Sequence, residues 1–134
     1  MIGAPVVWSG IVWIFGFGLD FGSFARVSFR TTAILLIFPV LEEIVFRGLI
    51  QDYLSNKTIG WDSFLGITWA NGLTTLLFCV THLVTRSLLV ALLVIVPSLL
   101  LGALRDRRFS IKTLATIHVY WNGGVYLLIG IPSS

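Results

Sequence analysis

Hydrophobic residues along the chain form long runs that are separated by short polar segments. The runs are about 17–25 residues long, which is the length an α-helix needs to cross a hydrocarbon core about 30 Å thick. They predict five helices, at residues 6–19, 31–53, 64–84, 87–104 and 111–131. We therefore expect an all-α fold, a polytopic bundle of about five transmembrane helices that forms one domain over residues 1–134.

Two of these segments contain residues that disturb a regular helix. Pro39 lies inside the second segment, three residues before Glu42, and predicts a kink there because proline removes a backbone hydrogen bond and crowds the preceding turn. In the third segment, Asn71-Gly72 could bend the helix.

Composition supports a membrane location. Of 134 residues, 57% are hydrophobic and 11% are charged, whereas a soluble domain carries about a quarter charged residues. The single cysteine, Cys79, excludes a disulfide within the chain and a CxxC metal site. The net charge of +3 fits loop lysines and arginines that face anionic lipid. No basic cluster is large enough for a nucleic-acid groove, so we expect a lipid bilayer as partner and no nucleic acid.

The most unusual stretch is Glu42-Glu43-Ile44-Val45-Phe46-Arg47, which places three ionisable groups inside an apolar run. Each such group costs a few kcal/mol at bilayer depth, so it needs a partner or a function. Glu43 and Arg47 are four residues apart and can pair on one helical face. Glu42 points about 100° away from Glu43, which leaves it able to act as a general base or acid.

Two histidines and an asparagine complete the set of intramembrane polar residues with chemical potential. His118 and Asn122 share a helical face, and two hydrogen-bond donors there could form an oxyanion hole. His82 could share a water molecule with Glu42, orient it and pass its proton to the leaving amine.

The same polar residues also have simpler, non-catalytic interpretations. Glu43–Arg47 alone is typical of a structural ion pair, and a single membrane histidine, or Phe78, is typical of packing. Glu42, His82 and His118 could also supply three zinc ligands, although the chain has neither an HExxH motif nor a thiolate set. We rank the zinc site as the second mechanism.

Three motifs occur in order on successive apolar segments: Glu42-Glu43-Ile-Val-Phe-Arg47, Phe78-Cys-Val-Thr-His82 and His118-Val-Tyr-Trp-Asn122. Together with Phe46-Arg47-Gly48-Leu49, this set resembles the CAAX protease and bacteriocin-processing family, also called CPBP or Abi. The resemblance covers about residues 41–122.

The resemblance implies a glutamate-type intramembrane endopeptidase that needs no metal or other cofactor and cuts a membrane-anchored or membrane-proximal substrate. By analogy, Glu42 and His82 activate water, His118 and Asn122 stabilise the oxyanion, and Glu43 and Arg47 support the site. We expect a multi-pass protein of the prokaryotic inner membrane. The alternatives are a non-catalytic immunity or assembly protein and a zinc-dependent membrane protease. The sequence decides neither the substrate nor the oligomeric state.

One geometric difficulty arises from the predicted helix ends. Counted from the basic side of the membrane, Glu42 lies about eleven residues into its helix and His82 about eighteen to twenty residues into its own. If both residues bind one water molecule, the third helix must therefore be tilted or broken near Asn71-Gly72, or the site must lie deeper.

Overall fold

A computed structural model describes residues 28–57 and 66–129, with side chains up to Tyr126. The chain divides into two compact units, one formed by Leu41–Ala115 and the other by Met1–Val40 together with Thr116–Ser134. The elements in the described ranges are all helical, which confirms the all-α class. The helix predicted at residues 6–19 lies outside the described residues, and the single domain stays a prediction.

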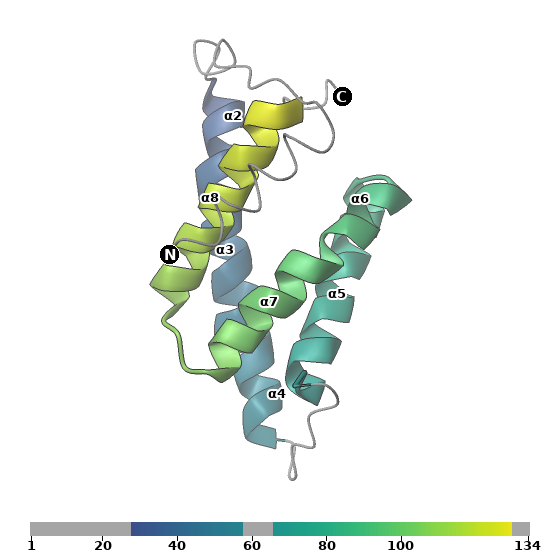
Figure 1. The fold of residues 1–134 in the computed structure, drawn as a ribbon, viewed down its shortest axis with the longest axis vertical. Coiled ribbons are helices and arrows are strands. Elements are labelled where there is room, and N and C mark those ends of the chain that lie inside the picture. Colours follow the sequence, from purple (N-terminus) through teal and green to yellow (C-terminus); the bar gives the residue numbers. More distant parts are fainter. Residues whose placement is uncertain (1–27, 58–65, 130–134) are drawn as a thin grey trace. The chain divides into compact units, whose positions relative to one another are not determined.

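The helix predicted at residues 31–53 is present and is longer at both ends. It consists of five consecutive elements, α2 (Phe29–Thr32), η2 (Ala33–Ile37), α3 (Phe38–Glu42), η3 (Glu43–Gln51) and α4 (Asp52–Lys57) (Figure 1). It begins after Ser28, whose Oγ accepts a hydrogen bond from the Thr31 amide at 3.2 Å. This is an N-cap, which satisfies a backbone donor that has no partner inside the helix.

Two parts of this helix, η2 and η3, are π-helical. The Phe38 amide bonds to the Ala33 carbonyl and the Asp52 amide to the Arg47 carbonyl, each five residues back instead of four. Pro39 lies just after the first of these segments and has no N–H to continue the ordinary pattern. The structure thus shows a widened turn just before Pro39, and the kink predicted there stays a prediction. π-Helical turns are rare and often occur at functional sites, and η3 contains Glu43 and Arg47.

Helix α5 (Trp69–Thr85) corresponds to the helix predicted at residues 64–84, but it starts later. Gly66 has a φ of 77°, and Thr68 is extended and caps the helix by accepting a hydrogen bond from the Asn71 amide at 3.1 Å. The helix then continues through Asn71 and Gly72 to Thr85 without a break. The break considered at Asn71-Gly72 is therefore absent, and the bend stays a prediction.

The segment predicted as one helix at residues 87–104 is divided into α6 (Leu88–Leu93) and α7 (Ile95–Asp106). The division falls at Val94, three residues before Pro97, whose ring crowds the carbonyl one turn earlier. Together Leu88–Asp106 is the one helical segment in the described ranges that is long and apolar enough to cross a membrane.

Helix α8 (Ile111–Ile129) matches the start of the helix predicted at residues 111–131, whose last two residues are outside the described ranges. Ser110 precedes it, and its Oγ accepts a hydrogen bond from the Thr113 amide at 3.2 Å. The helix begins in the unit Leu41–Ala115 and ends in the other.

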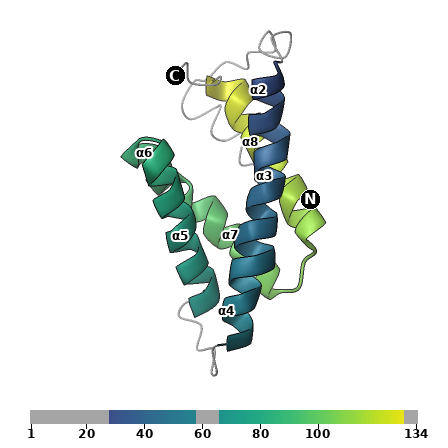
Figure 2. The same ribbon diagram turned by 180° about the vertical axis from the view of Figure 1, so that it is seen from behind.

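Within the unit Leu41–Ala115, α5 packs along η3 and α7 packs obliquely against both (Figures 1 and 2). The interior of this unit is strongly polar, with fully buried Glu43, Arg47, Gln51, Asn71 and Ser98. Its exterior is rich in exposed leucine and valine side chains, including Leu76, Leu89, Leu93, Val96 and Leu100. A soluble domain has the opposite arrangement, whereas polar groups that face the bundle interior are typical of a membrane protein.

Gly102 on α7 lies directly against the Asn71 side chain on α5. A Cβ atom at this position would lie 1.9 Å from Oδ1 of Asn71, well inside contact distance. The buried Asn71 side chain, which donates to the Leu99 carbonyl at 3.0 Å, fills the space that the missing side chain leaves.

We predict that Gly102→Ala lowers the free energy of unfolding by about 2–4 kcal/mol, because the methyl group displaces Asn71 from its buried hydrogen bonds. Thermal or SDS-induced unfolding in detergent micelles measures the change. Gly72→Ala is the matched control, since a Cβ there meets no described atom within 4 Å and helix propensity favours alanine by about 1 kcal/mol. Equal effects of the two substitutions would contradict this prediction.

Candidate functional site

Arg47 lies at the centre of the polar interior and is 1% exposed. Its Nη2 donates to both the carbonyl oxygen and the Oγ of Ser98, each at 2.9 Å. Its Nε lies 3.5 Å from Oε2 of Glu43, which is fully buried. The guanidinium carbon is 5.1 Å from the centre of the Phe78 ring, in reach of a cation–π interaction. The pairing of Glu43 with Arg47 expected from their spacing is present.

The hydrogen bonds continue from Ser98 to α5. Ser98 Oγ donates to Thr75 Oγ1 at 3.0 Å, and Thr75 donates to Asn71 Oδ1 at 3.3 Å. Asn71 in turn donates to the Leu99 carbonyl on α7. This closed set of bonds connects η3, α5 and α7 through buried polar side chains.

A second group of hydrogen bonds lies one helical turn further along η3 and α7. Gln51 Nε2 donates to the Gly102 carbonyl at 2.9 Å and to Asp106 Oδ1 at 2.8 Å. Asp106 Oδ2 accepts a hydrogen bond from Thr68, the cap of α5, at 2.9 Å. Beside it, Arg105 Nε donates to Asp52 Oδ1 at 2.8 Å.

Sequence reasoning missed most of this network. The available signal was a four-residue period of polar or small residues in two apolar helices. These are Glu43, Arg47 and Gln51 on one side and Ser98, Gly102 and Asp106 on the other. Residues at this spacing share a helical face, so the two rows can meet along their whole length.

His82 has a defined protonation pattern in its neutral form. Its Nδ1 lies 3.0 Å from the Phe78 carbonyl oxygen, which can only accept a hydrogen bond. Nδ1 therefore carries the proton, and Nε2 keeps a lone pair that can accept a proton or a hydrogen bond. The His82 side chain is half-buried.

Phe78 connects His82 with the first motif. Its ring centre is 4.4 Å from that of His82 and 4.9 Å from that of Phe46, and Arg47 lies over its ring. The packing role considered for Phe78 is confirmed, because the side chain is almost fully buried between these partners.

The observed helix ends remove the mismatch in depth between Glu42 and His82. Lys57 ends the long helix fifteen residues after Glu42, and His82 follows Trp69, the start of α5, by thirteen residues. The two helices are antiparallel, as Figures 1 and 2 show, and Phe78 contacts Phe46 and Arg47. One turn beyond Phe78, His82 therefore lies at the level of Glu42 and Glu43.

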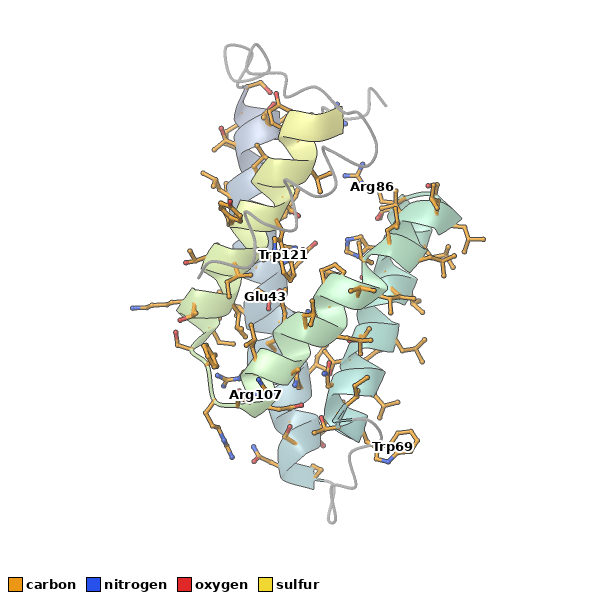
Figure 3. The ribbon with its side chains drawn as sticks, viewed as in Figure 1. Glu43, Trp69, Arg86, Arg107 and Trp121 are labelled. Atoms are coloured by element: carbon orange, nitrogen blue, oxygen red, sulfur yellow. The ribbon has the colours of Figure 1, made fainter. Side chains whose placement is uncertain are left out.

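The two neighbouring glutamates occupy different environments, as their helical positions predict. Glu43, labelled in Figure 3, is fully buried next to Arg47. Glu42 is half-buried. This difference fits a structural role for Glu43 and leaves Glu42 the more accessible carboxylate.

His118 and Asn122 lie four residues apart on α8, with Trp121 (labelled in Figure 3) between them in sequence. His118 is buried and Asn122 is half-buried. They belong to the unit that contains Thr116–Ser134, whereas Glu42 and His82 belong to Leu41–Ala115. The oxyanion role of His118 and Asn122 stays a prediction.

In the ranges that the structure describes, no group of three histidine, cysteine or acidic side chains is arranged to hold a metal ion. The zinc set of Glu42, His82 and His118 takes residues from both units and stays a prediction.

An all-α protein with a buried polar site and an apolar exterior belongs among helical membrane proteins, and the order of its three motifs favours a hydrolase. Residues 24–124 match the family described as type II CAAX prenyl endopeptidase Rce1-like. The chain belongs to this family of integral membrane proteases, which confirms the family resemblance found in the sequence. No curated protein and no solved structure gave a significant match.

The Glu43–Arg47 pair generates a stability prediction. Arg47→Met should lower the free energy of unfolding by about 3–5 kcal/mol, because it leaves the Glu43 carboxylate buried without its cation. SDS-induced unfolding in mixed micelles measures the loss. In the double variant Glu43→Leu/Arg47→Met the loss should be smaller than the sum of the two single losses. Additive losses would show that the two side chains do not stabilise each other.

The hydrogen bond from His82 to Phe78 generates a spectroscopic prediction. At a pH where the imidazole is neutral, ¹⁵N NMR of histidine-labelled protein should show His82 protonated at Nδ1 and unprotonated at Nε2. The variant His118→Gln assigns the signals, since the chain has two histidines. Protonation of Nε2 instead would contradict the structure.

Proposed function

We propose that this protein is an intramembrane endopeptidase that hydrolyses a peptide bond in a membrane-anchored or membrane-proximal substrate. Membership of a protease family supports the reaction class. The observation that carries the proposal is the contact of Phe78 with Phe46 and Arg47. His82 follows Phe78 by one helical turn, from which we infer that it lies at the level of Glu42. A base and a carboxylate at one level of two adjacent helices can hold one water molecule between them.

In the proposed reaction, Glu42 accepts a proton from this water while His82 Nε2 accepts its second hydrogen bond and orients it. The water oxygen attacks the carbonyl carbon of the substrate and forms a tetrahedral oxyanion. His118 and Asn122 donate hydrogen bonds to the oxyanion, which lowers the barrier because the negative charge develops only in the transition state. The proton then passes to the amide nitrogen, the C–N bond breaks, and an acid and an amine leave.

The remaining polar residues hold the helices and side chains of the proposed site in place. Glu43 and Arg47 are sealed from solvent and form an ion pair, and Arg47 also contacts Ser98 and Phe78, so both residues are structural in the proposal. Phe78 fixes His82 on one side through its carbonyl and through ring contact. A multi-pass membrane location agrees with the family and with the exposed leucine and valine side chains.

The family description directs the first choice of substrate to a prenylated C-terminal peptide. A bacteriocin leader peptide and a bacterial C-terminal sorting tail carry no prenyl group, so a panel of the three classes separates them. A farnesylated CAAX peptide and its unprenylated counterpart test whether the lipid itself is recognised.

We predict that Glu42→Gln and His82→Ala each lower kcat by about 10²–10⁴-fold in reconstituted vesicles, because each removes one of the groups that activate water. Asn122→Ala should lower kcat by about 10²–10³-fold with little change in KM, as expected for loss of an oxyanion donor. Cleavage is followed by mass spectrometry of the peptide products.

Leu41→Ala and Leu83→Ala are matched controls, because both side chains are exposed and each is adjacent in sequence to a proposed catalytic residue. They should cleave at the wild-type rate. Full cleavage by both Glu42→Gln and His82→Ala would sink the proposed mechanism. No cleavage of any peptide in the panel by wild type would favour a non-catalytic immunity or assembly protein. Loss of wild-type cleavage after chelator treatment, restored by Zn²⁺, would favour the zinc mechanism.

A further inference from the structure

The turn that follows α7, residues 107–110, contains an arginine in an unusual conformation. The Phe109 amide bonds to the Leu104 carbonyl at 3.1 Å, and the Arg108 amide bonds to the Arg105 carbonyl at 2.8 Å. These two bonds form a Schellman motif, in which the residue after the C-cap adopts the left-handed conformation. That residue is Arg108, with a φ of 68°.

Glycine usually occupies this position, because a Cβ atom crowds the following carbonyl oxygen in a left-handed residue. Among the residues that the structure describes, Arg108 is the one non-glycine residue with positive φ. A side chain kept in a strained conformation where glycine would fit is a reason to look for a function.

The turn holds its backbone rigidly and presents two arginines outward. Arg105 is used internally, since its Nε binds Asp52 and its Nη1 donates to the Phe109 carbonyl at 2.8 Å. Arg107 and Arg108 are exposed, and neither has a partner in the described part of the chain. Figure 3 labels Arg107 at the end of α7.

Nearby acidic groups do not bind these two arginines. Both oxygens of Asp106 accept hydrogen bonds, from Gln51 and Thr68, and Asp52 is bound by Arg105. No acidic side chain in the described ranges binds Arg107 or Arg108, so within these ranges the positive charge of the turn is open to a ligand.

The position of the turn indicates the ligand. It directly follows Leu88–Asp106, whose 19 residues are long and apolar enough to cross a membrane. At 1.5 Å per residue, α6 and α7 together contain about 28 Å of helix, interrupted at Val94, which is close to the thickness of the hydrocarbon core. Arg107 and Arg108 thus emerge where lipid phosphates lie, next to the Phe109 ring, which is 42% exposed.

We propose that Arg107 and Arg108 form a binding site for the phosphate of an anionic lipid headgroup. Guanidinium groups bind phosphate oxygens through paired, charge-assisted hydrogen bonds. The hydrogen-bonded turn holds both guanidinium groups on the same short segment. Placing the Arg108 guanidinium there costs backbone strain, because Arg108 must adopt the left-handed conformation. This site is separate from the proposed catalytic residues and does not depend on cleavage.

The experiment measures thermal unfolding of the full chain in neutral detergent micelles as phosphatidylglycerol or phosphatidylcholine is titrated in. Wild type should be stabilised by phosphatidylglycerol in a saturable way and much less by phosphatidylcholine. Arg107→Gln and Arg108→Gly should each weaken the apparent affinity for phosphatidylglycerol about fivefold. Arg108→Lys keeps the positive charge and should retain most of the affinity for phosphatidylglycerol.

Two further measurements test whether the backbone of Arg108 is strained and whether lipid binding is specific to this end of the helices. In neutral micelles Arg108→Gly should raise the melting temperature by roughly 2–8 °C, because glycine relieves the left-handed residue. Arg86→Gln removes an exposed charge after the other end of α5 and should leave the affinity for phosphatidylglycerol unchanged.

Four results would overturn the proposal. The first is unchanged phosphatidylglycerol affinity in both Arg107→Gln and Arg108→Gly, and the second is an equal loss in Arg86→Gln. The third is stabilisation by inorganic phosphate as strong as by the lipid, which would indicate a free-phosphate site. An unchanged or lower melting temperature of Arg108→Gly in neutral micelles would remove the strain on which the argument rests.

Discussion

The buried guanidinium of Arg47 constrains everything around it. A cation in an apolar environment is costly unless its hydrogen-bond donors find acceptors and its charge finds a counterion. Ser98 on α7 supplies two acceptors for Nη2, Glu43 supplies the opposite charge, and Phe78 on α5 covers the group with its ring. Nε and Nη1 are buried without a hydrogen-bond partner among the described residues, so the remaining contacts must offset this cost. Three helices must therefore meet at this one side chain, and they cannot slide past each other without breaking these bonds.

This constraint sets the register of the proposed catalytic residues. Contact of Phe78 with Phe46 and Arg47 fixes α5 along the long helix, and His82 comes one turn later at the level of Glu42. The bonds of Gln51 to Gly102 and Asp106 hold the same register further along. The network therefore affects the proposed site indirectly, by holding the helices in register. Most of its side chains are buried from solvent.

Helix α7 combines two roles on different parts of its surface. One face carries Ser98, Gly102 and Asp106 and completes the polar interior. Its end carries the exposed arginines that we assign to lipid headgroups. Binding at that end would hold α7, and with it the network around Arg47, at a defined depth in the membrane.

The sequence by itself determined the helical class, the family and the Glu43–Arg47 pair, because apolar run length and four-residue spacing are local properties of a helix. It missed the partners of that pair, Ser98 and Phe78, since contacts between helices depend on register, which no local pattern states. It also placed His82 too far from Glu42, because the apolar run hides the start of α5: Gly66 and Thr68 lie inside the run but are not helical, and the helix begins at Trp69. Only the tertiary structure decided the register, through a cation that must find its partners on three helices at once.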